Sequence, residues 1–410
     1  MSQPAPALAG ALAGLKVVDL TRVVAGPLCT QMLADHGARV TKVEPAAGDE
    51  SRNLGPPFDE VGVAAYFGAL NRGKRSLVLD LATAAGREVL HALLADADVL
   101  IENFLPGTLE RWGLGYESTL RAHHPRLVYC AISGFGRDGP LGNLPGYDAV
   151  LQAMGGLMSI NGTPESGPTR VGIPIVDIVT GYNALVGILL ALSVRAQSGR
   201  GQRVEATLFD SSLSLLIPHA ANWLASGRTP GLTGSAHPNI APYDKFRAGT
   251  REVFLGIVND AQFRRFCAAL GRDRMAADPR FADNRARVEN RTALRAEIER
   301  LLADRDPEEL CRELMAAGVP AGPVNTVPQA LAQSHALHRG MLVESDGHRA
   351  AGIAIKLGDT PGTPGTRPPA LAAQAAEILQ EVGFDPAAID RLAAAGAFGR
   401  TKKQGKERKP

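Results

Sequence analysis

The feature that most constrains the fold of this chain is the alternation of short apolar runs with helical stretches through its first third. The runs are rich in Val, Leu and Ile, and they predict strands at residues 15–20, 39–44, 75–81, 98–104 and 126–135. Parallel strands carry such near-continuous apolar sequences because helices cover both faces of their sheet. The pattern therefore predicts an α/β fold whose large domain is built on a Rossmann-like parallel sheet.

The segments that follow these strands are the places to look for a ligand site. In an open parallel sheet, ligands bind at the carboxyl ends of the strands, which here are residues 21–25, 103–105 and 133–135. A helix is predicted from Gly26 to about His36. No GxGxxG motif follows the first strand, so the sequence does not support a nicotinamide or flavin site.

Beyond this region the composition changes. A stretch rich in Gly, Pro, Ser and Thr at 227–239 is followed by a predicted hairpin and by helices at 260–270 and 292–317. A later strand-like segment at 350–357 would have few partners alone, so the chain is expected to return to its first domain. These features predict a large domain at 1–227, a small α+β domain at 228–328, a return to the large domain at 329–398 and a basic disordered tail at 399–410.

Composition excludes several classes of function. The 410 residues carry a formal net charge of +2, so no strong field favours nucleic acid. The N-terminal segment lacks the basic start and apolar core of a secretory signal, and the longest apolar run, at 184–194, is shorter than a bilayer span. Four dispersed cysteines without a CxxC pair indicate neither a disulfide framework nor a zinc site. We therefore expect a cytoplasmic protein with no metal, membrane or nucleic-acid partner.

One acidic residue stands out within an apolar segment. Asp177 lies in the run Gly172-Ile-Pro-Ile-Val-Asp-Ile-Val-Thr-Gly181, after a strand-like stretch at 173–176. Burial penalises an unpaired carboxylate, so such an acid is either a satisfied structural group or a reactive one. As a structural group it would cap the following helix by accepting hydrogen bonds from backbone N–H groups of the first turn. The segment alone favours the cap, since helix caps are common and nucleophilic carboxylates are rare.

An ordered series of motifs changes that balance. Along the chain they are LKVVDLTRVVAGP at 15–27, KVE at 42–44, GDxxR at 48–52, NRGKRS at 71–76, ENFLPG at 102–107, SGFG at 133–136, GIPIVDIVTG at 172–181 and GRGQ at 199–202. Each motif is weak alone. Together they resemble the class III CoA-transferase family, and the resemblance covers nearly the whole chain, from about Leu15 to Leu392.

What the resemblance implies is an enzyme that transfers coenzyme A between carboxylic acids. The family's nucleophile corresponds to Asp177, whose carboxylate would attack an acyl-CoA and pass through mixed anhydrides and an aspartyl-CoA thioester. Acyl-CoA and carboxylic acid are then the small-molecule partners, with no permanently bound cofactor, and the family also implies an interlocked homodimer. Backbone N–H groups at Gly134 and Gly181 are candidates for stabilising the oxyanion.

The resemblance also assigns CoA-binding positions. They correspond to Val24, Ala25, Leu79, Asn103, Phe104, Leu105, Arg111, Ser133, Gly134 and Phe135. The guanidinium of Arg111 suits a CoA phosphate, and it fits an exposed helix charge equally well. The three aliphatic residues at 24, 25 and 79 would pass as core without the resemblance. Some family members carry a basic residue where Pro45 stands, so one phosphate contact is expected to be missing.

Two other functions stay open. The family includes 2-methylacyl-CoA racemases, which pair the Asp with a His, and the corresponding residue here is Tyr147. A phenol with an ordinary pKa of about 10 exchanges an α-proton poorly at neutral pH, so Tyr147 favours CoA transfer over racemisation. A CoA-binding protein without turnover is the second alternative.

The acid substrates are predicted from a narrower similarity. The segment Ser235-Ala-His237 with Tyr243, and Arg170 before the Asp177 run, are similar to succinyl-CoA:glutarate CoA-transferases. This similarity suggests succinyl-CoA as the donor and a glutarate-like or itaconate-like acid as the acceptor. The second carboxylate of such an acid needs a cation or a hydrogen-bond donor, and the candidates are Arg170, Arg22 and His237. Arg170 fits a solvated Gly/Pro loop equally well.

Overall fold

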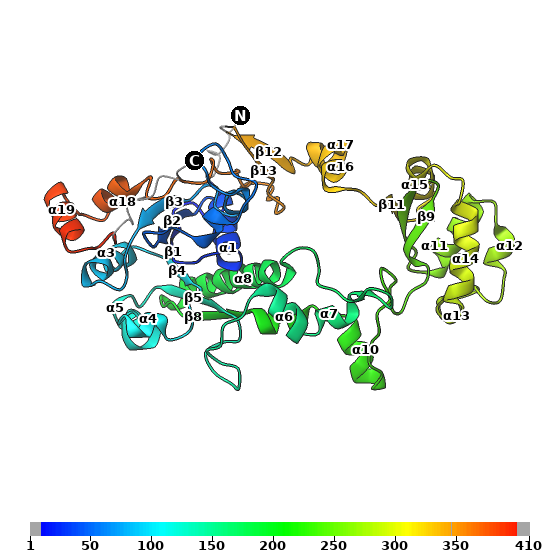
Figure 1. Cartoon of the computed structure of the whole chain (residues 1–410), viewed down its shortest axis with the longest axis horizontal. Coiled ribbons are helices and arrows are strands. Elements are labelled where there is room, and N and C mark those ends of the chain that lie inside the picture. Colours follow the sequence, from blue (N-terminus) through cyan, green and yellow to red (C-terminus); the bar gives the residue numbers. More distant parts are fainter. Residues whose placement is uncertain (1–9, 346, 400–410) are drawn as a thin grey trace, which may run out of the picture. The chain divides into compact units, whose positions relative to one another are not determined.

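The structure, a computed structural model, describes residues 10–345 and 347–399, and Figure 1 shows its elements. The chain divides into two compact units, of which the first runs to Gly155, continues over Gly172–Leu215 and resumes at His335, and the second comprises Gly156–Val171 and Leu216–Ser334. The second unit therefore extends beyond the small domain predicted at 228–328. The tail predicted at 399–410 lies outside the described residues, apart from Gly399.

A six-stranded parallel sheet forms the centre of the first unit. Its order is β3 (Arg75–Val78), β2 (Arg39–Glu44), β1 (Lys16–Asp19), β4 (Val99–Glu102), β5 (Val128–Ser133) and β8 (Arg203–Thr207). All five strands predicted from the apolar runs are present, and every neighbouring pair is parallel. The chain order reverses between β1 and β4, and at such a switch point the loops after the two strands diverge and leave a crevice for a ligand.

Helices cover both faces of this sheet. On one face α1 (Ala25–Asp35) packs against α8 (Ile175–Ser198), and α8 also packs on β5 and β8. On the other face lie α3 (Ala84–Leu94), α18 (Ala375–Glu381) and α19 (Pro386–Ala394). Their residues Leu90, Leu379 and Leu392 share one apolar core with Leu77 and Leu100 of the strands. The C-terminal helices thus complete a core that begins with the first strands.

The remaining elements around the first unit are short. They are η1 (Glu50–Asn53), α2 (Ala65–Gly68), α4 (Thr108–Arg111), η2 (Tyr116–Leu120), α5 (Arg121–His123), α6 (Asp148–Met154), α9 (Leu208–Ser214), α17 (Ser334–His338), β12 (Leu342–Ser345) and β13 (His348–Ala351). The strand predicted at 350–357 is wrong in its extent. Strand β13 ends at Ala351 and pairs with β12 in a two-stranded hairpin, so it does not join the main sheet.

The second unit is built on an antiparallel sheet of three strands. Their order is β11 (Ala321–Pro323), β10 (Arg251–Gly256) and β9 (Tyr243–Ala248). The other elements are α7 (Leu157–Ile160), β6 (Gly162–Thr163), β7 (Gly167–Pro168), α10 (His219–Ser226), α11 (Asp260–Ala269), α12 (Asp273–Ala276), α13 (Asn284–Glu289), α14 (Arg291–Leu302), α15 (Pro307–Ala316) and α16 (Val327–Ala332). The single helix predicted at 292–317 is divided, because Asp306 caps a new helix that begins at Pro307.

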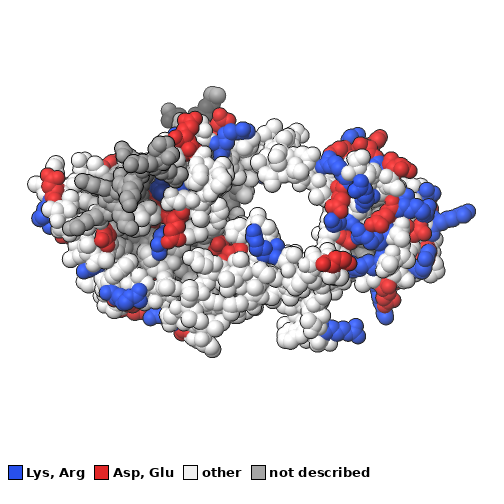
Figure 2. Space-filling view, in the orientation of Figure 1, with Lys and Arg blue, Asp and Glu red and all other residues white. Residues whose placement is uncertain are grey.

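The surface of the second unit carries charges of both signs. On the face shown in Figure 2, acidic and basic side chains are interspersed over its helices, and ion pairs such as Arg295–Glu299 and Arg300–Glu297 link them. Interspersed charges of this kind cancel at a distance and produce no steering field.

Helix α8 corrects two predictions. It begins at Ile175, so the stretch at 173–176 is not a strand, and Asp177 lies in the first helical turn. It also extends beyond the apolar run at 184–194, and by length and composition alone its 24 residues would suffice to cross a membrane. A single helix of this kind is weak support for a membrane span, since core helices pass the same test. Here α8 packs on the sheet and on α1.

One side of α8 is exposed although it is apolar. Val186, Leu190 and Val194 have exposed fractions of 53%, 63% and 49%, and Leu189 beside them is 40% exposed. The spacing of these residues by three and four positions places them on neighbouring rows of one helical face. We call these four residues the α8 stripe.

Candidate active site

Asp177 lies at the N-terminus of α8, where a different element supplies the helix cap. The residue before the helix, Pro174, makes no side-chain cap. Instead Asp148, the first residue of α6, accepts hydrogen bonds at Oδ1 from the N–H groups of Val176 (2.8 Å) and Asp177 (3.3 Å). Its Oδ2 accepts a hydrogen bond of 2.7 Å from Nε2 of Gln152. The capping role that the sequence favoured for Asp177 therefore belongs to Asp148.

The carboxylate of Asp177 has no compensating cation. Across residues 10–345 and 347–399, no hydrogen bond or ion pair reaches its side-chain oxygens. Burial, and after it the negative charge of Asp148, raise the pKa of Asp177 to about 7. The phenol of Tyr66 on α2 responds to the same surroundings, because burial and then the charges of both acids raise its pKa. A carboxylate of this kind is more basic than an ordinary one and is typical of a functional site.

Asp177 lines a cavity of about 290 Å³ at the carboxyl ends of β1, β4 and β5. The predicted site residues that line it are Arg22, Val24, Ala25, Asn103, Phe104, Leu105, Ser133, Gly134 and Asp177 itself. Tyr147, which stands at the racemase His position, also lines it and is 67% exposed. The three loops that the sheet topology predicted as ligand-binding therefore meet at one place, beside the first turn of α8.

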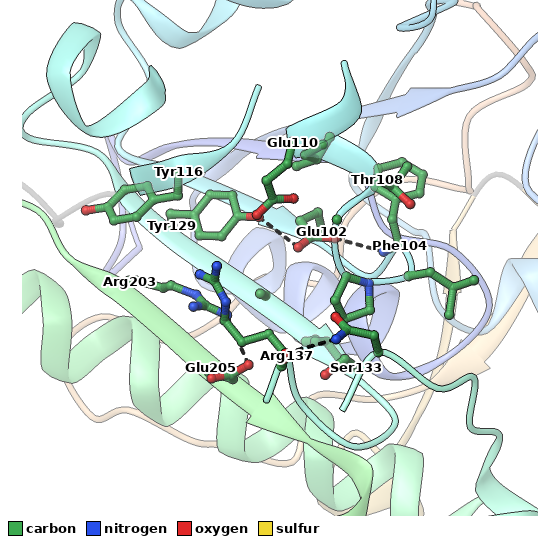
Figure 3. Close-up of a pocket in the computed structure, with 17 residues that line it drawn as sticks. Glu102, Phe104, Thr108, Glu110, Tyr116, Tyr129, Ser133, Arg137, Arg203 and Glu205 are labelled. Carbon is green, nitrogen blue, oxygen red and sulfur yellow. Dashed lines mark hydrogen bonds and ion pairs between the residues drawn. The ribbon is translucent and has the colours of Figure 1, made fainter. Parts of the chain in front are cut away.

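A second cavity, of about 280 Å³, lies on the other side of the loop after β4 and shares its wall at 104–106 and 132–133 with the first. Figure 3 shows Glu102 at its floor. The Glu102 carboxyl accepts hydrogen bonds of 2.8 Å from the N–H of Phe104 and from the hydroxyl of Tyr129. Burial raises the pKa of Glu102 to about 7, and these two hydrogen bonds oppose the rise only in part. Glu102 thus anchors the loop that carries three of the predicted CoA contacts.

Two arginines also line the second cavity. Arg203 of β8 pairs with Glu205 at 3.0 Å, and Arg137 comes from the loop after β5. Neither arginine pairs with Glu102, so within the described part of the chain no cation is in contact with that buried acid, as for Asp177.

Three predicted CoA-binding residues lie outside the walls of both cavities. Leu79 is 2% exposed, and its side chain belongs to the apolar core. The ring of Phe135 packs on that of Phe209 with a centroid distance of 5.8 Å. Arg111 is exposed at the end of α4 and donates a 2.9 Å hydrogen bond to Oγ1 of Thr108. The CoA-binding roles of these three residues stay predictions.

Two of the predicted acid-binding residues belong to the second unit. Arg170 is exposed and donates a 3.1 Å hydrogen bond to the carbonyl of Val171. His237 packs edge-on against Tyr243 at 5.3 Å, and its Nδ1 accepts the N–H of Asn239 at 3.1 Å. The third candidate, Arg22, belongs to the first unit, pairs with Glu50 at 3.3 Å and lines the Asp177 cavity. The part of all three in acid recognition stays a prediction.

The two glycines named as oxyanion donors differ. Gly181 lies inside α8, where its N–H is directed along the helix toward the preceding turn, so the predicted role does not fit. A Cβ at Gly181 would stand 2.7 Å from the carbonyl oxygen of Ala25, so this glycine allows α1 and α8 to pack closely. Gly134 lines the cavity and approaches Gly146, whose backbone nitrogen would be 2.8 Å from a Cβ at 134. Gly134 remains a candidate.

Charged residues within the apolar strands form a buried network that sequence reasoning missed. Its ion pairs are Lys42–Asp49 (2.9 Å), Lys74–Asp19 (3.1 Å) and Arg52–Glu44 (2.7 Å). Burial would raise the pKa of Asp19, but the cations Lys74 and Lys42 outweigh it and lower that pKa to about 2. The signal was available, because Lys42 lies within a predicted strand of a sheet that helices cover on both faces, and a buried lysine requires a partner.

The fold and the cavity define the class, an α/β protein with a cavity at the switch point of a parallel sheet, and comparison with known proteins defines the family. The model of CoA-transferase family III matches residues 12–375, so the chain belongs to this family and is a CoA-transferase. It is 40% identical to the succinate–glutarate CoA-transferase of Agrobacterium fabrum, over 90% of this chain and 95% of that protein. It is 41% identical to the succinyl-CoA:mesaconate CoA-transferase of Haloarcula hispanica, over 91% and 97%. The crystal structure of a CaiB/BaiF family protein from Brucella suis matches with a TM-score of 0.82 and 43% identity, over 92% of this chain and 100% of that one.

Proposed function

We propose that this CoA-transferase moves coenzyme A from succinyl-CoA to a short dicarboxylic acid of the glutarate or itaconate type, with Asp177 as the nucleophile. The observation that carries the proposal is the half-buried carboxylate of Asp177, which has no cation partner among the described residues and lines a cavity with the predicted CoA loops. The acid class is supported by two relatives, a succinate–glutarate CoA-transferase and a succinyl-CoA:mesaconate CoA-transferase.

The proposed chemistry runs through two mixed anhydrides. The ionised carboxylate of Asp177 attacks the thioester carbonyl carbon, the C–S bond breaks, and CoA leaves as a thiolate. The thiolate then attacks the Asp177 carbonyl of the anhydride and expels the donor acid as a carboxylate, which leaves an aspartyl-CoA thioester. The acceptor carboxylate attacks this thioester, and the same two steps run in reverse. Every attacking and leaving group is an anion, so the cycle needs no net proton transfer.

Burial of Asp177 serves this chemistry in two ways. A poorly solvated carboxylate with a raised pKa is a stronger nucleophile than an exposed one. Exclusion of water also protects the anhydrides, which hydrolyse readily. The cost is that a pKa of about 7 leaves part of the enzyme protonated, and therefore inactive, at neutral pH.

The racemase alternative is disfavoured by Tyr147, which lines the cavity where a racemase carries a His. Deuterium wash-in at the α-carbon of an acyl-CoA, without exchange of the acid, would support the racemase instead. Tight binding of CoA without either reaction would support a protein that only binds CoA.

We further propose that the protein is a cytoplasmic homodimer. An exposed apolar patch on a helix face, such as the α8 stripe, favours association with another apolar surface. In a two-fold dimer the stripe of one subunit can pack against the same stripe of the other, so a second copy of the chain is sufficient to bury it. The four cysteines are free and buried, which agrees with a reducing compartment. Sedimentation velocity should show a dimer, and replacement of Leu190 by Glu should shift it toward the monomer.

The decisive experiment is mass spectrometry of enzyme quenched during turnover of succinyl-CoA. We expect an adduct on Asp177, and a label elsewhere, or none while product accumulates, would overturn the proposal. A panel of acceptor acids assayed with succinyl-CoA identifies the acid class. Arg170→Ala should raise the KM for dicarboxylates more than for monocarboxylates, and an equal change would remove Arg170 from acid recognition.

A further inference from the structure

The turn after β1 contains a strained residue next to the proposed nucleophile. Val23 has a φ of +69°, in the left-handed region that a β-branched residue rarely adopts. The described residues contain two other non-glycine residues with positive φ, Asn143 and Ala372, but Asn tolerates this region and Ala has no β-branch. Val23 directly precedes Val24 and lines the same cavity as Asp177. Backbone strain persists only where the surroundings over-determine the conformation.

The two residues before Val23 are each fixed by different side chains. Thr21 donates its N–H to Oδ1 of Asp19 at 2.8 Å, and its carbonyl accepts a 2.8 Å hydrogen bond from Nζ of Lys42. Arg22 forms a reciprocal pair with Asn103, whose Oδ1 accepts the backbone N–H at 2.9 Å and whose Nδ2 donates to the carbonyl at 2.8 Å. The turn is thereby tied both to the buried ion pairs and to the predicted CoA-binding loop after β4.

Val23 itself is held by Asp49. Its N–H donates a hydrogen bond of 3.2 Å to Oδ1 of Asp49, a residue with 0% exposure. The same oxygen accepts the N–H and the hydroxyl of Ser51, at 2.9 and 2.7 Å, and Oδ2 pairs with Lys42 at 2.9 Å. Both carboxylate oxygens of Asp49 are therefore held, Oδ1 by hydrogen bonds and Oδ2 by the ion pair with Lys42. The hydrogen bond from Val23 is thus made to an acceptor whose position is fixed.

We propose that Asp49 is a positioning residue for CoA transfer, which holds Val23 in the left-handed conformation and so sets where Val24 and Ala25 stand beside Asp177. The inference deepens the proposed function and rests on it. Without this contact Val23 relaxes toward the extended region that a valine prefers, and the change in φ redirects the peptide that leads into α1. This change would displace Val24 and Ala25, which line the cavity, because α1 begins at Ala25.

A mutant cycle between positions 23 and 49 tests this coupling. Asp49→Asn keeps the shape of the side chain, but an amide offers one oxygen and one NH₂ group. It therefore satisfies either the N–H of Val23 or the ammonium of Lys42, and not both. Val23→Gly removes the strain, since glycine adopts positive φ at no steric cost. Ala372→Gly is the matched control, a glycine at another positive-φ position.

We expect Asp49→Asn to lower kcat/KM for succinyl-CoA at least tenfold in the wild-type background and no more than threefold beside Val23→Gly. Beside Ala372→Gly the loss should stay at least tenfold. Equal losses in all three backgrounds would mean that Asp49 acts only on general stability, and would overturn the proposal.

Hydrogen exchange of the peptide covering 21–25 gives a readout that does not depend on turnover. Asp49→Asn should speed its exchange, and Val23→Asn, with Asp49 intact, should slow it, because asparagine tolerates the left-handed region. The comparison of Val23→Asn with the wild type tests the strain even where Asp49→Asn does not fold. If exchange in Val23→Asn is no slower than in the wild type, the turn is not strained and the proposal is overturned. Failure of the proposed function is distinguished separately, as absence of an adduct on Asp177 in the wild-type enzyme.

Discussion

Two sets of buried acids in the first unit have opposite electrostatic surroundings. Asp19, Glu44 and Asp49 each contact a buried cation, and the pKa of each is lowered although burial alone would raise it. Glu102, which is buried, and Asp177, which is half-buried, contact no cation among the residues that the structure describes, and the pKa of each is raised to about 7. All five lie on or near one parallel sheet. The position of a cation, and not burial itself, therefore separates a structural carboxylate from one that can react.

The difference has a consequence for stability. A paired buried acid is costly to break, because removing its cation leaves a desolvated charge. An unpaired acid such as Asp177 destabilises the fold whenever it is ionised, which is the condition under which, in our proposal, it attacks the thioester. The charge that most disfavours folding is thus that of the proposed nucleophile. Four predictions test this contrast between paired and unpaired acids.

The largest effect is expected from Asp177→Asn. The amide is not a nucleophile, so exchange of CoA between succinyl-CoA and an acceptor acid should fall by more than about 10³-fold. CoA binding, measured by calorimetry, should change little because the side chain keeps its shape. Asp19→Asn is the control from the paired set, and it should lower stability while the remaining folded enzyme still forms the Asp177 adduct. Activity of Asp177→Asn near that of the parent would refute the contrast.

Lys42→Met should produce the largest loss of stability. It removes the cation of a fully buried pair and leaves Asp49 uncompensated, which should lower the free energy of unfolding by about 3 kcal/mol or more. Urea denaturation followed by circular dichroism measures the change. Arg285→Met is the control, because Arg285 is an exposed residue of an (i, i+4) pair and its replacement should change the stability far less. A loss below about 1 kcal/mol for Lys42→Met would show that the pair is not needed.

Asp148→Asn should shift the pH profile without abolishing activity. The amide oxygen still accepts the N–H of Val176, but the negative charge that helps to raise the pKa of Asp177 is gone. The rise of kcat/KM with pH, which follows ionisation of Asp177, should therefore move to lower pH. An unmoved midpoint with lower activity would indicate that Asp148 acts only as a helix cap.

The smallest effect is expected on the thermal stability of Asp177→Asn. The pKa of Asp177 is raised in the folded state, so its contribution to stability is complete below its unfolded pKa of about 4 and is lost as pH rises through about 7. Asp177→Asn has no carboxyl group to ionise, so it does not lose this stability as pH rises. The Tm difference from the wild type should therefore grow in favour of the variant between pH 5 and pH 8, and a difference that is constant over this range would contradict the raised pKa.

Much of the first unit could be predicted from the sequence because its signals are local. Apolar runs gave all five strands, and the rule for parallel sheets identified the loops that line the Asp177 cavity. The role of Asp177 could not be read from its own segment, because the residue that caps α8 is Asp148, 29 residues earlier in the chain. The pairing of Asp49 with Val23 is likewise invisible in the sequence, since it depends on a backbone angle and on a contact across a loop.

The errors have physical causes of the same kind. The segment at 173–176 is apolar and contains Pro174, and short apolar runs do not distinguish a strand from the start of a buried helix. The strand predicted at 350–357 is too long, because only its first residues pair with another strand, β12. The oxyanion role of Gly181 does not fit because α8 begins at Ile175, so Gly181 lies within the helix and its N–H is directed toward the preceding turn.

Helix α8 is one continuous rod of about 36 Å, given its 24 residues. Its first turn carries Asp177, the proposed nucleophile, and its middle turns carry the α8 stripe. A second subunit packed on that stripe would contact the same helix that orients Asp177, so dimerisation would affect the position of the proposed nucleophile and with it the rate of turnover. Dilution of the enzyme to concentrations at which copies separate would then slow catalysis before any loss of secondary structure.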